Sequence, residues 1–191
     1  ADGALGPVKI GGDLRGVANL DGKNNAEIRG GDGMASLFIG GSIIGEGSFN
    51  AGILVSGAVG PITIKGNILG GSRASGFIEI TGESINAPPA SVKSLTLGGS
   101  IIGGTGEASI SGTVLVDGPL GPVKVGGSNV GGYSLSPLLV PSFSGAIRAT
   151  TIAKVTIAGS LIAPPSSDGT VGFETGSIVA DEIGLVIIGG D

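Results

Sequence analysis

The length, composition and charge of the chain exclude several functional classes. Its 191 residues include 41 glycines and 40% hydrophobic residues, but no Trp, His or Cys. Without His and Cys, the chain cannot build Ser–His or Cys–His nucleophile systems, disulfides, or metal sites with nitrogen and sulfur ligands. The formal net charge of −5 argues against a nucleic-acid partner, which would require a basic face. We expect one domain over residues 1–191 that holds no cofactor.

The abundant glycine is typical neither of a linker nor of collagen. Glycine is roughly three times as frequent as in an average protein. Flexible glycine-rich linkers lack the many Ile, Val and Leu residues present here, and collagen requires glycine at every third position. Two uncharged stretches, residues 47–64 and 125–147, are long enough to cross a bilayer, but prolines, serines and glycines interrupt them. We therefore expect no membrane span.

Seven copies of one phrase organise the chain. The first copy reads Leu5-Gly-Pro-Val-Lys-Ile-Gly-Gly-Asp-Leu-Arg-Gly16. The copies start at residues 5, 34, 59, 92, 120, 152 and 183, and the last one is truncated. Their spacing runs from 25 to 33 residues. Self-similarity at such a period indicates a solenoid, a propeller or another repeat array.

Each copy predicts two short strands, and a second phrase predicts a third. Val8 and Ile10 flank Lys9, and this alternation indicates a strand with one buried face. A Gly-Gly pair then allows a tight corner, after which comes a short apolar pair such as Ile43-Ile44. The second phrase has a small residue and an apolar residue two positions later. Its copies start at Ala26, Gly52, Gly76, Gly112, Gly145 and Gly176.

Three short strands and their corners predict one coil of a β-solenoid. We expect an all-β parallel β-helix of about six coils with ~30 residues each, right-handed because parallel β connections favour that hand. Two ladders of apolar side chains would fill the core. The first contains Val8, Leu37, Ile62, Leu95, Val123, Val155 and Val186, and the second contains Ile10, Ile39, Ile64, Leu97, Val125, Ile157 and Ile188. An antiparallel barrel or sandwich is the alternative, but it explains a seven-copy phrase poorly.

A polar residue follows each Gly-Gly corner. These residues are Asp13, Ser42, Asn67, Ser100, Ser128, Ser160 and Asp191. Stacked in a column, they could form a row of ligand-binding groups. Short polar side chains at corners more commonly satisfy backbone groups, and we favour this structural interpretation.

Motifs for phosphate, calcium and ice binding are incomplete. The pair Gly22-Lys23 is followed by Asn24, so no P-loop is present. Two stretches come close to a calcium-binding β-roll repeat, but Ala35 and Ala108 occupy the positions of the ligating aspartates. A flat threonine array for ice binding is interrupted by lysines. We therefore expect no metal site and no ice-binding face.

Paired carboxylates are the remaining candidates for catalysis. Glycoside hydrolysis requires two carboxyl groups that flank the scissile bond. The closest candidates are Glu79 with Glu83, and Asp181 with Glu182. Because the fifteen acidic residues are otherwise dispersed, we interpret them as solvated surface groups and expect no enzymatic activity.

The longest loop between the two phrases is a candidate contact surface. It runs from residue 132 to 144 and combines aromatic residues with an apolar segment between two prolines. Such a patch could contact a cell-surface partner or a glycan, or it could fold back over the side of the solenoid. The candidate contact residues are Tyr133, Leu138, Leu139, Val140 and Phe143.

The repeat phrase resembles known glycine-rich sequences. Gly-Pro-Val-Lys-Ile-Gly-Gly-Asp-Leu-Arg-Gly, alternating with Ser-Gly-x-Ile, resembles the parallel β-helix repeats of large secreted or surface proteins of bacteria, including planctomycete-like and autotransporter-passenger-like regions. The resemblance covers essentially the whole chain. It implies an extracellular or cell-surface location and a rod-like, non-catalytic role.

The two ends of the predicted solenoid suggest self-association. Solenoids usually cover their terminal strands with a capping element, and the sequence shows none. An uncovered edge favours the opposite end of a second copy, which would produce a head-to-tail extracellular filament. The residues predicted to meet are Val8, Lys9 and Ile10 at one end and Leu185, Val186, Ile187 and Ile188 at the other. A passenger region of a bacterial surface adhesin and a polysaccharide-active enzyme are the alternative functions.

Overall fold

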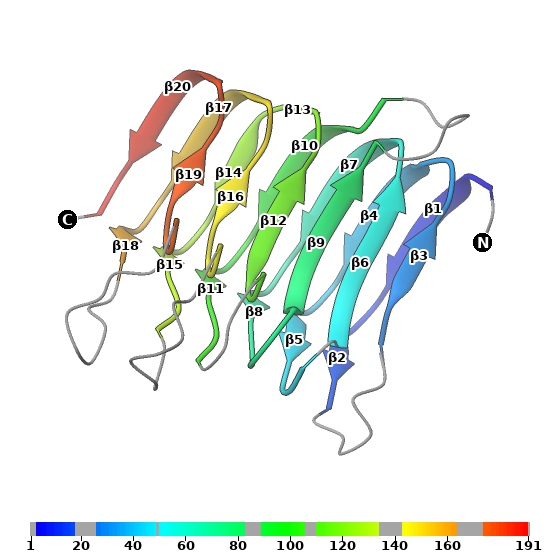
Figure 1. Ribbon diagram of the computed structural model, residues 1–191, viewed down its shortest axis with the longest axis horizontal. Helices are drawn as coiled ribbons and strands as arrows, with labels where there is room; N and C mark the ends of the chain where they lie inside the picture. The colour runs from blue at the N-terminus through cyan, green and yellow to red at the C-terminus, as the bar shows by residue number, and fades with distance from the viewer. Residues whose placement is uncertain are drawn as a thin grey trace.

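Parallel β-strands form all the regular structure of the described residues. The computed structural model describes residues 3–17, 26–48, 50–82, 89–105, 110–133, 143–163 and 174–190, and these contain no helix. The strands build three sheets that run side by side along one column (Figure 1). We name them sheets A, B and C in the order in which each coil visits them. This arrangement confirms the predicted all-β parallel solenoid.

Sheet A contains the longest strands. They are β1 (Leu5–Ile10), β4 (Met34–Ile39), β7 (Ala58–Ile64), β10 (Ser91–Leu97), β13 (Pro119–Leu120), β14 (Val123–Val125), β17 (Thr151–Ile157) and β20 (Glu182–Ile188). Strands β13 and β14 both pair with β10 and β17, so together they form one level of the sheet. We call each such level a rung, and sheet A has seven rungs among the described residues.

Sheets B and C have six rungs each in the same part of the chain. Sheet B contains β2 (Leu14–Gly16), β5 (Ile43–Gly45), β8 (Ile68–Leu69), β11 (Ile101–Ile102), β15 (Asn129–Val130) and β18 (Leu161–Ile162). Sheet C contains β3 (Ile28–Gly30), β6 (Asn50–Ser56), β9 (Ser75–Thr81), β12 (Thr113–Val116), β16 (Ile147–Arg148) and β19 (Ile178–Val179). Strand β20 therefore projects one rung beyond β18 and β19 (Figure 1).

The path of the chain is a right-handed coil. In Figure 1 the chain descends through sheet A at the back, crosses through sheet B at the bottom and rises through sheet C at the front, while it advances from right to left. The pairing register in sheet A joins the predicted starts of successive copies. It pairs residue 5 with 34, 34 with 59, 59 with 92, 92 with 120, 120 with 152 and 152 with 183.

Both predicted core ladders are confirmed. The register stacks each of their residues on the equivalent residue of the next rung. In the inner rungs these side chains are 2% exposed or less. No single coil can bury its inward residues alone, so stacking is what removes them from water.

The second phrase is assigned correctly except at one copy. The register pairs Ile28 with Ile53 and Ile53 with Ile78, so the copy starts at Ala51 and the predicted start at Gly52 is wrong by one residue. The starting position requires a left-handed backbone, with φ of 52° at Ala51 and 59° at Gly76. Glycine usually marks such a position, and here alanine occupies it while a glycine follows directly.

The second glycine of each Gly-Gly corner is required by the neighbouring rung. A Cβ atom on Gly99 would lie 2.2 Å from Asn67 Oδ1, and one on Gly127 would lie 2.2 Å from Ser100 Oγ. On the first described rung, no atom lies within 4 Å of the Cβ position of Gly12. The first glycine also lies close to the preceding rung, because a Cβ atom on Gly98 would lie 2.2 Å from the Lys65 carbonyl oxygen. Lys65 and Ala158 occupy this position in two other rungs.

We expect the effect of alanine at the second glycine to depend on whether a preceding rung lies beside it. Gly99→Ala should lower the free energy of unfolding by about 2–3 kcal/mol, because its methyl group would overlap the preceding corner. Gly12→Ala, the matched control at the same corner position of the first described rung, should cost less than about 1 kcal/mol, since no atom lies within 4 Å of its Cβ position. Urea unfolding followed by circular dichroism measures both values. Equal losses would contradict the steric explanation.

One polar side chain interrupts the apolar ladder of sheet B. Asn129 is fully buried and pairs with Ile101 and Leu161 of the adjacent rungs. Its Nδ2 donates to the carbonyl of Ser177 at 3.3 Å, but its Oδ1 accepts no hydrogen bond. A buried acceptor without a partner destabilises the folded state.

Replacing Asn129 with leucine should therefore stabilise the fold. We expect Asn129→Leu to raise the free energy of unfolding by about 1–2 kcal/mol, because it removes the unpaired Oδ1. The Ser177 carbonyl keeps a donor, since Ile147 N–H donates to it at 2.9 Å. Ile101→Asn, the reverse change one rung away, should cost about 3 kcal/mol. A loss of stability in Asn129→Leu would show that the amide is needed.

Candidate functional site

The side chains of the polar column at the Gly-Gly corners accept hydrogen bonds from the backbone of the next rung. The backbone N–H of each column residue donates to the side chain of the column residue one rung earlier. Ser42 N–H donates to Asp13 Oδ1 at 2.7 Å, and Ser100 N–H donates to Asn67 Oδ1 at 2.7 Å. The bonds from Asn67 to Ser42, from Ser128 to Ser100 and from Ser160 to Ser128 are each 3.0 Å long. This pattern confirms the structural interpretation of the column, of which Asp191 lies outside the described residues.

A second polar column, which the sequence analysis did not identify, lies inside the corner between sheets B and C. Its members are at most 6% exposed and are Asn50, Ser75, Ser111, Ser144 and Thr175. Ser111 Oγ accepts from Gly104 N–H and donates to the Gly71 carbonyl, both at 3.1 Å. In the sequence, this column could have been recognised from the polar residue that stands directly before the small residue of the second phrase. This column is also structural, because its side chains bind backbone groups.

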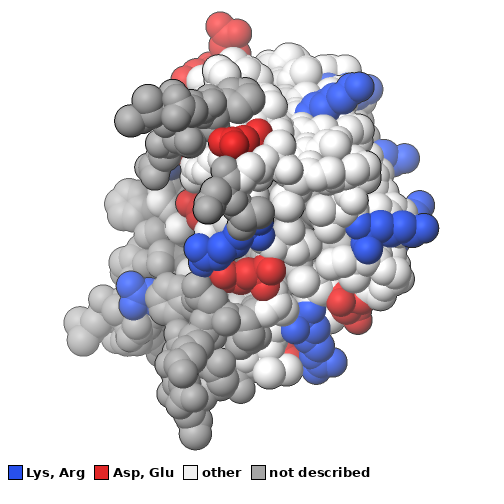
Figure 2. Space-filling view, turned by 90° about the vertical axis from the view of Figure 1, so that its right-hand side faces the viewer, with Lys and Arg blue, Asp and Glu red and all other residues white. Residues whose placement is uncertain are grey.

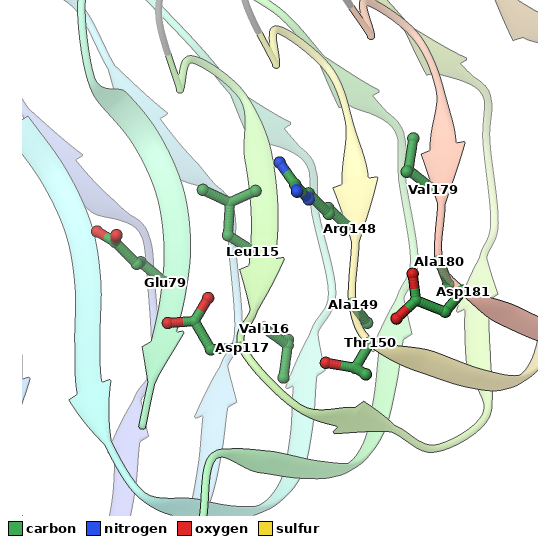
Figure 3. Close-up of a pocket in the computed structure, with 10 residues that line it drawn as sticks. All are labelled: Glu79, Leu115, Val116, Asp117, Arg148, Ala149, Thr150, Val179, Ala180 and Asp181. Atoms are coloured by element: carbon green, nitrogen blue, oxygen red, sulfur yellow. The ribbon is translucent and has the colours of Figure 1, made fainter. Parts of the chain in front are cut away.

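A groove on the outer face of sheet C gathers charged side chains. It has a volume of about 410 Å³ and is lined by Glu79, Asp117, Arg148, Thr150 and Asp181 among others (Figure 3). Glu79 extends from β9 and Arg148 from β16, whereas Asp117 and Asp181 lie at the corner that leads to sheet A. The structure thus brings the candidates Glu79 and Asp181 to one groove, together with Asp117. Glu83 lies outside the described residues, and Glu182 begins β20.

The outward column of Glu79 reflects the one-residue shift in the second copy of the second phrase. Because the second phrase is shifted at its second copy, Leu54 and not Val55 stands beside Glu79, and Val55 points into the core. No other acidic residue belongs to this column among the described rungs. The additional carboxylates come from the next outward positions, at Asp117 and Asp181.

Asp117 and Asp181 do not have the arrangement of a glycosidase carboxylate pair. Asp117 and Asp181 are both exposed, and their strands are two rungs apart, about 10 Å at the usual strand spacing. A general acid in such an enzyme is held in a desolvated pocket, and neither carboxylate has one.

Arg148 lies over the ring of Phe143, with 5.1 Å from its Cζ to the ring centroid. Among the described residues, no group of three acidic side chains could hold a metal ion.

The predicted contact loop is only partly described. Leu138, Leu139 and Val140 lie outside the described residues, so the loop stays a predicted contact surface. Tyr133 is exposed and forms a bridge with Thr105. Phe143 is half-buried, and its carbonyl accepts a hydrogen bond from Thr113 Oγ1.

The two end rungs differ in how far they are exposed. At the first rung Val8 and Ile10 are half-buried and Lys9 is exposed. At the last rung the inward residues Val186 and Ile188 are 44% and 40% exposed, while their equivalents Val155 and Ile157 are fully buried. The outward residues Leu185 and Ile187 are 50% and 43% exposed. All four residues predicted for this end are thus exposed apolar side chains.

Comparisons with known proteins give no match: no protein family, curated protein or solved structure is similar to this chain. Within the described ranges there is no helix of the length and hydropathy that would cross a membrane. The functional argument therefore rests on the surfaces described above.

Removal of one corner hydroxyl tests the role of the first polar column. We expect Ser100→Ala to lower the free energy of unfolding by about 1–2 kcal/mol, because Ser128 N–H loses its acceptor. Ser94→Ala is the matched control, since this half-buried serine on the outer face of β10 forms no side-chain hydrogen bond within the described residues. It should change stability by less than about 0.5 kcal/mol in the same denaturation experiment. Equal effects would argue against a structural column.

Proposed function

We propose that this chain is a non-catalytic structural protein, a β-solenoid subunit that stacks head to tail into an extracellular filament. The observation that carries the proposal is the last rung of sheet A. Its inward side chains, Val186 and Ile188, continue the core ladders but are 44% and 40% exposed. An uncovered apolar strand edge is a template for pairing with a further strand.

A second copy supplies the matching edge. If β1 of that copy pairs with β20, Val8 stands beside Val186 and Ile10 beside Ile188. This is the register that β20 already uses with β17, where Val186 pairs with Val155 and Ile188 with Ile157. The two core ladders would then continue from one copy into the next.

Hydrogen bonding at the corners also makes the two ends complementary. At the Gly-Gly pair of each corner the later rung donates and the earlier rung accepts, as in Gly40 N–H to the Ile10 carbonyl at 2.8 Å and Gly41 N–H to the Gly12 carbonyl at 2.9 Å. At these corner positions the first rung therefore presents backbone N–H groups, and the last rung presents the carbonyl groups of Ile188 and Gly190. Donors of one copy can meet acceptors of the next.

Contact between two different ends produces an open polymer. Such a contact is heterologous, so it leaves one free end of each kind after every addition. A non-catalytic role is supported by the two polar columns, whose side chains bind backbone groups of the solenoid itself. The extracellular location rests on the resemblance of the repeat phrase to secreted and surface proteins.

Substitution of the last rung tests the proposal. We expect the unmodified chain to form longer species as its concentration rises, and Val186→Lys to weaken association at least tenfold, because stacking would bury an unpaired charge. Ile102→Lys is the matched control, since it adds the same charge at an aliphatic side chain that is 38% exposed on the side of the column. Sedimentation velocity across a dilution series measures the sizes.

Electron microscopy of the same samples provides the second readout. Rods with an axial repeat of about 34 Å, seven strand spacings of about 4.8 Å, would support in-register stacking. Circular dichroism establishes that the two lysine variants retain their strands. Closed dimers, or monomers at every concentration of the unmodified chain, would overturn the filament proposal.

A further inference from the structure

Lysine residues gather on the outer face of sheet A. The chain has six lysines, and five of them belong to strands of this sheet or to the residue directly after one of its strands. These five are exposed, and they are Lys9, Lys65, Lys93, Lys124 and Lys154. Rungs three to six carry one lysine each. We call this surface the lysine face.

The strands of sheet A carry one acidic side chain beside these lysines. It is Glu182, at the start of the last rung, while Asp13, Asp32, Asp117 and Asp181 lie at the adjoining corners. Both ion pairs among the described residues are made by arginines on the other two sheets, Arg15 with Glu46 and Arg29 with Glu27. Pairing with Glu27 raises the pKa of Arg29, mainly through the hydrogen bond from Nε to Oε2.

The positive face is therefore distinct although the whole chain has a net charge of −5. Figure 2 views the column along its axis from the first rung, and blue side chains project from its right-hand rim, where sheet A lies. Successive rungs are about 4.8 Å apart, but the lysines do not form one column. Lys124 is offset by three residues from Lys93 and by two residues from Lys154 along the strands, so the ammonium groups are spread over the face.

The other side chains on this face are polar and uncharged. Hydroxyl groups occupy outward positions in four rungs, at Ser36, Thr63, Ser94, Thr96 and Thr156. They can donate to and accept from the hydroxyl groups of a sugar. Together, ammonium groups on successive rungs and hydroxyls suit a linear partner that carries both negative charges and many hydroxyls.

We propose that the lysine face binds an acidic polysaccharide, such as a chain of uronic acids, extended along the column. Nucleic acid is the less suitable polyanion. The face has no arginine forks and only one aromatic ring, Phe38, which has the Lys9 ammonium 5.8 Å from its centroid. The net charge of −5 also opposes approach of a densely charged duplex.

Binding to defined polymers tests this inference. Immobilised sodium polygalacturonate, neutral dextran and duplex DNA are each exposed to the full chain, and binding is measured by biolayer interferometry at several salt concentrations. We expect binding to polygalacturonate that falls steeply with salt, and weaker or no binding to dextran and DNA. Measurements in the Val186→Lys background separate this inference from filament formation.

Two triple variants with equal charge provide the control. Lys93→Gln/Lys124→Gln/Lys154→Gln and Arg15→Gln/Arg29→Gln/Arg148→Gln each remove three positive charges, on sheet A and on the other sheets respectively. We expect the lysine variant to bind polygalacturonate at least tenfold more weakly with a shallower salt dependence, and the arginine variant to lose less than twofold. Circular dichroism establishes that both fold.

Three results would overturn the inference. They are equal losses in the two triple variants, binding to dextran as tight as to polygalacturonate, and tighter binding to DNA than to either polysaccharide. The first would mean that only net charge matters, the second that the lysines do not select the ligand, and the third that the partner is a nucleic acid.

Discussion

The spacing between parallel strands is the constraint on which this structure depends. Every coil must rise by one strand spacing, about 4.8 Å, and each corner must fit within that height. The second glycine of each Gly-Gly pair satisfies this limit, because a methyl group at Gly99 or Gly127 would overlap the polar side chain of the preceding rung. A high glycine content and a packed aliphatic core are therefore parts of one solution, in which glycine forms the corners and branched residues fill the interior.

The same constraint determines which side chains are left for function. Polar groups at two corner columns bind the backbone of the adjacent rung, so they hold the coils together. Outward residues of the strands are not used in this way. They form long columns of equal spacing, in which a few lysines or carboxylates can be repeated along the axis. Extended partners, or further copies of the same solenoid, match such surfaces better than a small substrate does.

The core could be predicted from the sequence because its signal is local. The alternation of Val8 and Ile10 recurs in seven copies, and stacking equivalent residues needs no knowledge of the rest of the fold. The start of the second phrase is harder to predict, because alanine adopts the required left-handed backbone at Ala26 and Ala51, where the other four copies use glycine. The groove at Asp117 and Asp181 could not be predicted by following the column of Glu79, because it joins two neighbouring outward columns. Likewise, Asn129 lies in a position that the repeat assigns to an apolar residue.

The unequal number of rungs in the three sheets has a mechanical consequence for the proposed filament. Sheet A projects by one rung, so in-register stacking on β20 joins copies through a continuous sheet on one side of the column. On the other two sides, β2 and β3 of the incoming copy would then stand two strand spacings from β18 and β19. Each junction would act as a hinge in which the two copies are joined along sheet A. The filament would consist of stiff segments, and it would bend at the junctions between them.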